Sequence, residues 1–344
     1  MAMVKADAYG HGMEECAAVF SNCGAAAFGV AEVVEGVRLR QAGFVQPIYI
    51  LAGLLPEFFD AIIDYDLTPV LVDAGLVDLL AQAAQRRNQT LAVHLKVDAG
   101  MGRQGCLPSA AADVIDRIQR TSGLQLAGIM AHFPMADDSV GGNSRQVLAD
   151  FLRVMPAVAM QHPQIKRHIA NSGGIFTVAG AQLDMVRPGI ALYGYGPSST
   201  WNSTLPGNGD ELQPAMSFVS RVIQLREVPA GTGLGYGHIF TTTRTTRLAV
   251  LPVGYEDGYA RDLSNRAVVL LHGRRVPVVG RISMNLTLLD VTEISSVKPG
   301  DEVVLLGRQG SERITADDIA GWRDTISYEI LCLFGHCNRK EYAA

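Results

Sequence analysis

The first part of the chain, up to about residue 196, alternates short apolar runs with stretches in which apolar residues recur every three or four positions. Eight runs alternating with helical stretches predict a parallel (β/α)8 barrel. The predicted strands are Met3–Lys5, Ala26–Val30, Ile48–Leu51, Leu67–Val72, Ala92–Val97, Leu126–His132, Arg167–Asn171 and Met185–Tyr193. The predicted helices include Glu32–Gln41, Glu57–Ile63, Gly75–Arg86, Ala110–Arg120 and Arg145–Val158.

A doubly wound sheet has the same alternation, so the number of strands does not separate the two folds. The positions of the polar residues favour the barrel. Five of them lie at or just after the carboxyl end of their strand, which is the rim where barrels build their active sites. These residues are Lys5, Lys96, His132, Asn171 and Arg187.

The pattern changes after a segment rich in Ser, Pro, Gly and Asn, which we interpret as a linker. Short strands joined by turns follow, and two short helices lie near the end. We therefore expect a barrel over residues 1–196, a linker over 197–214 and a mostly β C-terminal domain over 215–344. The predicted strands here are Ala215–Val228, Leu248–Val253, Ala267–Leu271, Val276–Val279, Leu286–Val291 and Glu302–Leu306, and the helices are Ala316–Trp322 and Ile326–Phe334.

Composition narrows the class of protein. The net charge of −5 and a pI near 5.9 argue against nucleic acid or an anionic membrane as the main partner. The five cysteines are scattered and include no CxxC pair, which favours reduced thiols over a disulfide framework or a zinc site. There is no signal-peptide pattern, and no apolar run is long enough to span a bilayer. We expect a cytoplasmic protein without a metal.

The chemistry begins at Lys5, which ends the first apolar run and is followed by a small, turn-prone segment. Burial at a strand end disfavours the charged ammonium form of a lysine. Lys5 is therefore either an ordinary charged residue near the N-terminus or an amine made nucleophilic for Schiff-base formation. Residues 171–174 (Asn-Ser-Gly-Gly) and 187–190 (Arg-Pro-Gly-Ile) are two turns suited to binding an anion, one at the end of the seventh predicted strand and one that ends the first half of the eighth. In barrels, phosphate is often held by the loops after strands seven and eight. Together these features suggest pyridoxal phosphate, with Arg187 near the pyridine nitrogen.

Two further segments carry candidate groups. The run 94–103 leads from the fifth strand into a glycine-containing loop, and its Arg103 is suited to bidentate capture of a carboxylate. In the second domain, Tyr236 lies between two glycines and is a candidate acid or base, although a plain turn tyrosine is the simpler interpretation. The run 233–237 lacks the helix that a dinucleotide-binding loop requires, so we exclude that interpretation.

At this point the chain resembles the alanine racemases over nearly its whole length, from Val4 to about Arg339. Nine segments occur in the order typical of that family. They are 4–12 (VKADAYGHG), 96–103, 132–133, 171–173, 187–194 (RPGIALYG), Tyr236, 252–258 (PVGYEDG), 280–284 (GRISM) and 326–330 (ISYEI).

The resemblance implies a racemase that interconverts L-alanine and D-alanine and supplies D-alanine for peptidoglycan. Lys5 would carry the cofactor and act as one base, and Tyr236 of the partner subunit in a homodimer would be the other. Inversion by proton exchange needs one base on each face of a planar intermediate, which agrees with two bases. The phosphate would be held by Tyr9, Ser172, Gly189, Ile190 and Tyr328.

The resemblance also assigns the remaining groups. Arg187 would donate to the pyridine nitrogen, and His132 would connect Arg187 towards Tyr236. Because a guanidinium does not give up its proton near neutral pH, this nitrogen should stay largely unprotonated. Arg103 and the backbone at Met284 would bind the substrate carboxylate, and Lys96 is a position of possible carbamylation. Tyr255 and Tyr328 would line the access to the substrate site, and Asn171 belongs to the cofactor-binding set.

Alternatives remain within and outside this class. A barrel-type decarboxylase of basic amino acids would need a catalytic cysteine in the second domain, and the Gly-Tyr-Gly turn argues against it. A racemase of serine or another small amino acid is harder to separate, although Tyr328 and Met284 imply a tight pocket. A non-catalytic pyridoxal-phosphate-binding protein would need neither a second base nor a second domain.

The chain departs from the family pattern at two places. Alanine racemases usually have a strand and a helix before the lysine segment, and neither precedes Lys5 in this sequence, so either the gene start is short or the protein does without an element that covers apolar surface. We expect lower stability or solubility than in a form that carries it. The second departure is Asn285, where the family usually has Asp, so any charge interaction of that carboxylate is lost.

Overall fold

The computed structural model describes residues 1–136, 142–154, 164–198 and 211–343. These residues form two compact units. One contains Met1–Ala8 and Gly12–Leu212, and the other contains Tyr9–His11 and Gln213–Ala344. The linker predicted over 197–214 lies largely outside the described residues, as do the last residues of the helix predicted over Arg145–Val158. Within the described ranges, none of the helices is both long and apolar enough to cross a membrane.

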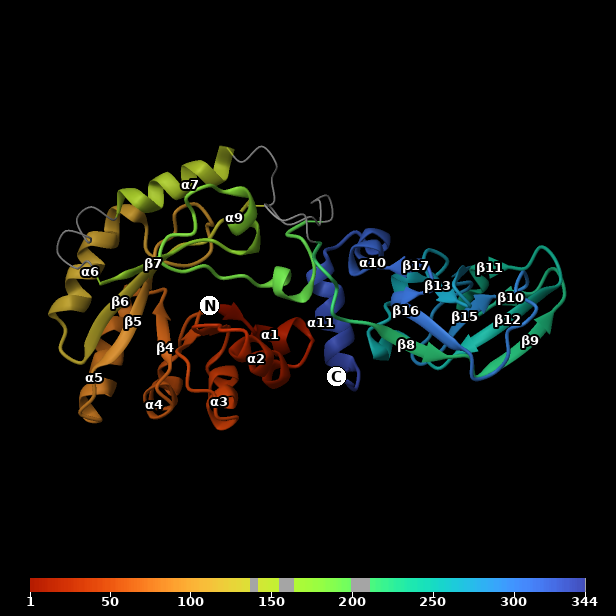
Figure 1. Cartoon of the computed structure of the whole chain (residues 1–344), viewed down its shortest axis with the longest axis horizontal. Coiled ribbons are helices and arrows are strands. Elements are labelled where there is room, and N and C mark those ends of the chain that lie inside the picture. Colours follow the sequence, from red (N-terminus) through yellow and green to blue (C-terminus); the bar gives the residue numbers. More distant parts are fainter. Residues whose placement is uncertain (137–141, 155–163, 199–210, 344) are drawn as a thin grey trace. The chain divides into compact units, whose positions relative to one another are not determined.

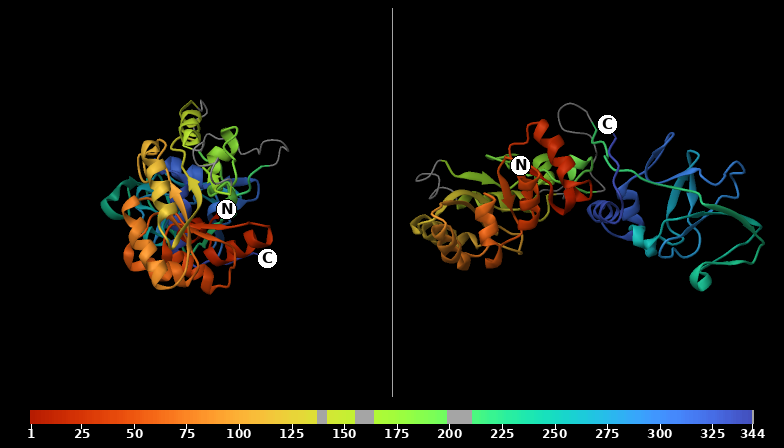
Figure 2. Two further views of the ribbon diagram at one scale, coloured as in Figure 1. Left: turned by 90° about the vertical axis from the view of Figure 1, so that its left-hand side faces the viewer. Right: turned by 90° about the horizontal axis from the view of Figure 1, so that it is seen from below.

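The first unit is a curled parallel sheet with helices on its outer side (Figure 1; left view of Figure 2). Each strand pairs with the next along the chain, in the order β1 to β7. Strands β2 and β3 are buried at every residue, as expected for a parallel sheet covered on both faces. The strands are β1 (Ala2–Met3), β2 (Phe28–Val30), β3 (Ile48–Ile50), β4 (Thr68–Leu71), β5 (Leu91–Lys96), β6 (Leu124–Met130) and β7 (Lys166–His168).

The longer helices of this unit bury one mostly apolar face each. In α5 (Val77–Arg86), for example, Val77, Leu80, Ala81 and Ala84 are buried, at the spacing of one helix face. The other helices are α1 (Lys5–Tyr9), α2 (Met13–Asn22), α3 (Val33–Gln41), α4 (Phe59–Asp64), α6 (Ala111–Arg120), α7 (Gly142–Arg153) and α9 (Ser172–Thr177). Short 3-10 helices are η1 (Pro56–Phe58), η2 (Ala74–Leu76), η3 (Pro108–Ala110) and η4 (Ile190–Tyr193).

The prediction of an eighth strand over Met185–Tyr193 is wrong. Residues 184–188 occupy its place without forming a regular strand. They bond to β7 and the residues after it through Asp184 N to Arg167 O (3.1 Å) and Arg187 N to Ala170 O (2.9 Å). On the other side, Met3 N donates to Pro188 O (3.1 Å). Pro188 has no N–H for a continuous ladder, and η4 begins two residues later. The barrel predicted from the sequence is confirmed, but this irregular segment closes it.

The second unit is mostly antiparallel β structure with two helices. Its sheets have the strand orders β15-β12-β9 and β14-β13-β16-β17, with β8 on β16 and a separate β10-β11 pair. The prediction of a single strand over Ala215–Val228 is wrong, because this segment forms two strands, β8 and β9, which pair with different strands. The elements are β8 (Phe218–Arg221), β9 (Gln224–Val228), β10 (Gly233–Leu234), β11 (Phe240–Thr241), β12 (Thr246–Leu251), β13 (Val268–Leu271), β14 (Arg274–Pro277), β15 (Thr287–Asp290), β16 (Glu302–Gln309), β17 (Glu312–Ile314), η5 (Tyr236–His238), η6 (Tyr255–Asp257), η7 (Arg261–Leu263), α10 (Ala316–Arg323) and α11 (Ser327–Cys337).

Candidate active site

Lys5 follows β1 and begins a turn with an unusual hand. Residues Ala6 to Tyr9 all have φ between 52° and 55°, the left-handed helical conformation, although none of them is glycine. The turn is held from outside: Ala6 N donates to Glu35 Oε1 (2.6 Å), and Met13 N donates to Asp7 Oδ1 (3.0 Å). This geometry reverses the chain immediately after Lys5 and keeps the lysine at the carboxyl end of β1.

Arg187 is the centre of a buried polar network. The side chain is 3% exposed, and one Nη atom donates to Ala131 O (2.7 Å) and Ile169 O (3.0 Å). The same Nη atom lies 3.2 Å from His132 Nδ1, and His132 Nε2 lies 3.5 Å from Asn171 Nδ2. The structure therefore brings Arg187, His132 and Asn171 together at the rim, as the sequence pattern predicts. Burial lowers the pKa of Arg187 to about 9, which leaves it a cation at neutral pH.

Four cationic side chains act electrostatically on His132. Burial, followed by the positive charges of Arg187, Arg103, Lys96 and Lys5, lowers the pKa of His132 to about 3. His132 is therefore neutral at physiological pH. Residues from the ends of β1 and β5 and from the closing segment all contribute, although up to 182 positions separate them (187 − 5). Such a concentration of positive charge suits a ligand that carries several negative groups.

Lys96 and Arg187 are the two buried members of this cationic group. Lys96 ends β5, is 3% exposed, and its Nζ atom lies 3.4 Å from Gln104 Oε1. Burial, then the charges of Arg103 and Arg187, lowers the pKa of Lys96 to about 8. About a tenth of the amine is therefore unprotonated at pH 7, and this is the form that reacts as a nucleophile.

Ser172 connects the two turns predicted to bind an anion. Its Oγ atom accepts hydrogen bonds from Gly189 N (2.9 Å) and Ala191 N (3.3 Å) and is buried. Asn171 caps α9 by accepting from Gly174 N (2.9 Å). Gly189 and Ile190 thus lie beside Ser172, where the hydroxyl of the first turn meets backbone N–H groups of the second.

The loop that carries Arg103 is organised by Asp98. The carboxylate accepts backbone hydrogen bonds from Gly100 (3.1 Å), Gly102 (2.9 Å) and Arg103 (3.0 Å). Burial alone would raise the pKa of Asp98, but these N–H groups together with that of Met101 lower it. This role of Asp98 was not predicted from the sequence, although an acidic residue two positions before a Gly-x-Gly pair is a usable signal for such a turn.

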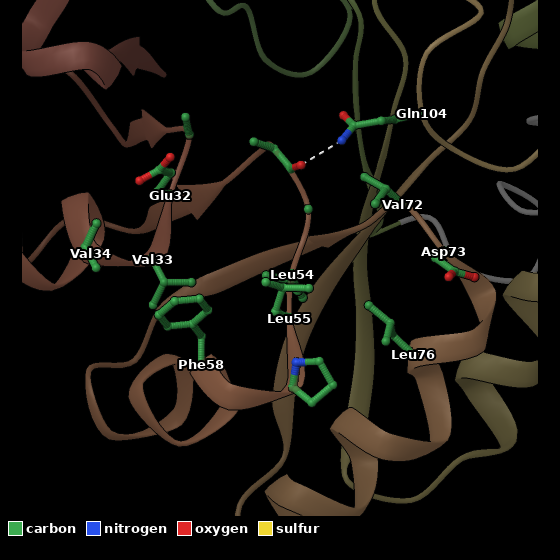
Figure 3. Close-up of a pocket in the computed structure, with 14 residues that line it drawn as sticks. Glu32, Val33, Val34, Leu54, Leu55, Phe58, Val72, Asp73, Leu76 and Gln104 are labelled. Atoms are coloured by element: carbon green, nitrogen blue, oxygen red, sulfur yellow. Dashed lines mark hydrogen bonds between the residues drawn. The ribbon is translucent and has the colours of Figure 1, made fainter.

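A pocket of about 640 Å³ lies next to this loop, at the carboxyl ends of β2, β3 and β4. Figure 3 shows its walls, which include Val33, Leu54 and Phe58, and Gln104 at the upper edge. Gln104 Nε2 donates to Ala52 O (2.6 Å), and the other end of the same amide faces Lys96. Gln104 therefore joins the wall of the pocket to the cationic group, a connection that the sequence did not reveal.

The remaining predicted residues belong to the second unit. Tyr236 begins η5 between Gly235 (φ 67°) and Gly237 (φ 71°), and 70% of its surface is exposed. Tyr255 and Met284, 42% and 54% exposed, lie on adjoining loops that are joined by Tyr255 N to Ser283 O (3.1 Å). These loops approach closely at Gly254, where an added Cβ would lie 2.2 Å from Met284 O.

Two more contacts in this unit bear on the predicted site. The rings of Tyr9 and Tyr328 lie 6.0 Å apart at 51°, so these two proposed phosphate ligands are neighbours. Asn285 Nδ2 donates to Glu256 Oε2 (2.5 Å). An aspartate at position 285 would instead oppose the charge of Glu256.

Comparison with known proteins agrees with this geometry. Residues 1–197 match the family model for the alanine racemase N-terminal domain, and residues 215–342 match that for the alanine racemase C-terminal domain. The alanine racemase of Halothermothrix orenii is 40% identical over 343 residues, which are 99% of this chain and 89% of that protein. The alanine racemase of Syntrophobacter fumaroxidans is 40% identical over 342 residues, which are 99% and 90% of the two chains.

Solved structures are also similar. The alanine racemase of Clostridium difficile 630 superposes with a TM-score of 0.88 at 32% identity and covers 96% of this chain and 85% of its own. An alanine racemase from Bartonella henselae with covalently bound pyridoxal phosphate has a TM-score of 0.87 at 29% identity, with coverage of 99% and 92%. One from Bacillus anthracis with bound L-Ala-P has a TM-score of 0.88 at 30% identity, with coverage of 97% and 85%.

Proposed function

Since this chain belongs to the alanine racemase family, a family of pyridoxal-phosphate-dependent isomerases, we propose that it interconverts L-alanine and D-alanine with Lys5 and Tyr236 as its two bases. The observation that carries the proposal is the buried arrangement at the rim: Arg187 donates to His132 (3.2 Å), and the Ser172 hydroxyl joins the two turns predicted to bind an anion by accepting from Gly189 N (2.9 Å). A phosphate and a substrate carboxylate are the two anions that this reaction must hold.

The described residues fit the cofactor. None of Lys96, Arg103 and Arg187 forms an ion pair within the described ranges, so their charges remain available to a ligand. The buried Ser172 hydroxyl and the backbone around Gly189 form a polar turn of the kind that holds phosphate. We propose that Ser172, Gly189, Ile190, Tyr9 and Tyr328 hold the phosphate, with Asn171 fixing the turn.

Bound pyridoxal phosphate supplies an electron sink that makes the α-hydrogen of an amino acid acidic. Arg187 would donate a hydrogen bond to the pyridine nitrogen and leave it unprotonated, because the guanidinium keeps its own proton near neutral pH. His132 accepts from Arg187 and fixes the guanidinium from a second direction. Lys5 and Tyr236 would each hold or release one proton, on opposite faces of the substrate α-carbon.

Substrate recognition follows from the remaining groups. Arg103, held on the loop that Asp98 orders, would bind the substrate carboxylate together with the backbone at Met284. We propose that Lys96 carries a carbamate: its neutral amine forms a C–N bond to CO2 and releases one proton. The resulting anion would face Arg103, the charge that now lowers the pKa of Lys96. Tyr255 and Tyr328 would border the way to the substrate.

The proposal requires a homodimer, because Tyr236 would enter the site of the partner subunit. Its 70% exposed ring is available for such a contact. We also propose the division into a cofactor-binding barrel (1–196), a linker (197–214) and a β domain (215–344), and a cytoplasmic location, which the scattered cysteines support.

The direct test follows the α-hydrogen. The purified protein is incubated in D2O with L-alanine and, separately, with D-alanine, and the products are analysed by chiral chromatography and mass spectrometry. Deuterium in the inverted product from both enantiomers is expected. L-serine in a parallel reaction measures how strictly the pocket selects a methyl group. Absence of inversion with either enantiomer would refute the proposal.

A complementation experiment tests the shared site. Lys5→Ala and Tyr236→Phe proteins are each expected to be inactive. Co-expressed, they form hybrid dimers in which one site has both bases and the other has neither. Random pairing then restores about a quarter of the wild-type activity, because half of the dimers are hybrids with one intact site. No recovery would mean that both bases come from the same chain.

A further inference from the structure

Behind Arg187, two histidines form a buried chain that the proposed mechanism does not use. His168 Nδ1 lies 2.8 Å from an Nη atom of Arg187, and His168 Nε2 lies 2.8 Å from His94 Nδ1. The exposed fractions are 0% for His168 and 1% for His94, and their ring centroids are 5.0 Å apart. Tyr49 packs against His94 edge to face, with centroids 4.8 Å apart. The three polar groups therefore form a line from the rim into the barrel interior.

The chemistry of the three groups determines where the protons lie. Burial and the charges of Lys166 and Arg187 lower the pKa of His94 to about 3. Burial and the charge of Arg187 hold the pKa of His168 well below its ordinary value, so both rings are neutral. Arginine only donates, so His168 Nδ1 must accept and its proton lies on Nε2. That N–H donates to His94 Nδ1, which must therefore be unprotonated as well.

The sheet is irregular where it accommodates the His94 ring. The register between β5 and β6 shifts between Val93 and His94, so that His94 pairs with Gly128 instead of Ala127. A Cβ added at Gly128 would lie 2.1 Å from Cε1 and 2.4 Å from Nδ1 of the His94 ring. Any other residue at position 128 would therefore displace the imidazole. Both the bulge and the glycine serve to seat this ring.

We propose that His94 is a positioning residue for Arg187. By accepting the Nε2–H of His168, it keeps His168 Nδ1 unprotonated, and that atom holds the guanidinium in its orientation. Without His94, the His168 Nε2–H would be buried without an acceptor, which removes the preference for the tautomer that Arg187 needs. The consequence for racemisation rests on the role of Arg187 in the proposed function.

The test compares two substitutions at one position. His94→Leu fills similar space and removes the acceptor, whereas His94→Asn retains an acceptor oxygen near the place of Nδ1. In the holoenzyme, His94→Leu is expected to lower kcat in both directions on the order of 10-fold, the size typical of losing an outer hydrogen-bond partner. The KM for alanine should change little, because Arg103 is untouched. His94→Asn should retain most of the wild-type kcat. Equal losses in both variants, or a wild-type kcat in His94→Leu, would overturn the proposal.

A second pair of variants leaves His94 itself intact. Gly128→Ala is expected to displace the ring and reproduce the kcat loss of His94→Leu. Gly321→Ala is the matched control, because an added Cβ there meets no atom within 4 Å. Circular dichroism verifies that each variant is folded. Wild-type kcat in a folded Gly128→Ala protein would contradict the assignment.

Protonation is measured independently of activity. In ¹⁵N-labelled protein, long-range ¹H–¹⁵N spectra distinguish a protonated from an unprotonated ring nitrogen, and the His168 signals are assigned by their loss in His168→Gln. His168 should carry its proton on Nε2 in the wild type, and this preference should be lost in His94→Leu. A proton on Nδ1, or a charged ring, would refute the inference even if the protein racemises alanine. Conversely, a wild type with the expected tautomers but no racemase activity would refute only the proposed function.

Discussion

The left-handed turn after Lys5 leads to a prediction of unusual sign. Glycine in place of alanine normally destabilises a helix by about 0.5–1 kcal/mol, because glycine loses more backbone freedom on folding. At Ala6 (φ 52°, ψ 49°), however, an L-residue is strained by about 1–2 kcal/mol, and glycine removes that strain. The side chain of Ala6 is exposed, so the lost methyl group removes little packing. Ala6→Gly should therefore stabilise the protein by about 0.5–1 kcal/mol.

The measurement is the thermal and urea-induced unfolding of the holoenzyme, followed by circular dichroism with the cofactor at a fixed saturating concentration. The matched control is Ala18→Gly, because Ala18 is an exposed alanine within the right-handed helix α2. The two variants carry the same chemical change and should shift the unfolding midpoint in opposite directions, upwards for Ala6→Gly and downwards for Ala18→Gly. A destabilised Ala6→Gly protein would show that this turn stores no strain.

Four further predictions concern the rim. Asp98→Ala should raise the KM for alanine about 10-fold with a smaller change in kcat, because the Arg103 loop loses its N–H acceptor; steady-state kinetics measure this. Because the pKa of Asp98 is lowered in the folded protein, the stability that Asp98 contributes is present above about pH 4 and is lost as the pH falls through the folded value; the difference in unfolding free energy between wild type and Asp98→Asn should vanish in acid. Ser172→Ala should weaken cofactor affinity about 10-fold, as measured by equilibrium dialysis, because two backbone donors lose their acceptor. ¹³C-bicarbonate should give a carbamate signal in wild type and none in Lys96→Gln; the same signal in both would place the carbamate elsewhere.

Much of the fold could be predicted from the sequence, because buried parallel strands are short apolar runs separated by amphipathic helices. The predicted first seven strands all occur, with bounds that differ by a few residues. The prediction of a strand over Met185–Tyr193 failed for a local reason. Hydrophobicity alone favours a strand here, but Pro188 and Gly189 interrupt its ladder of backbone hydrogen bonds. The division of Ala215–Val228 has a non-local cause, since its halves pair with β16 and β12.

The site, like the fold, could be predicted only in part from the sequence. Lys5, Lys96 and His132 could be placed on the rim, because a residue at a strand end in a parallel sheet has a known position. The histidine chain could not, because His94 and His168 are 74 residues apart and meet only through the register of the sheet. The left-handed turn was equally hidden, since Ala-Asp-Ala-Tyr contains no glycine to indicate positive φ. The roles of the site residues in catalysis remain predictions until the variants are measured.

The segment 184–188 that closes the barrel has a consequence for the order of assembly. β1 is synthesised long before the segment that bonds to its second edge. The amino group of Met1 donates to Val186 O (3.0 Å), 185 positions away, and Tyr193 Oη donates to Met3 O (2.7 Å), 190 positions away. Such distant pairing is slow, because the loop must close before its contacts can form. Lys5 and Arg187 lie on the two sides of this closure. The cofactor pocket on the barrel therefore cannot be complete before residues 184–193 have been synthesised and have bonded to β1.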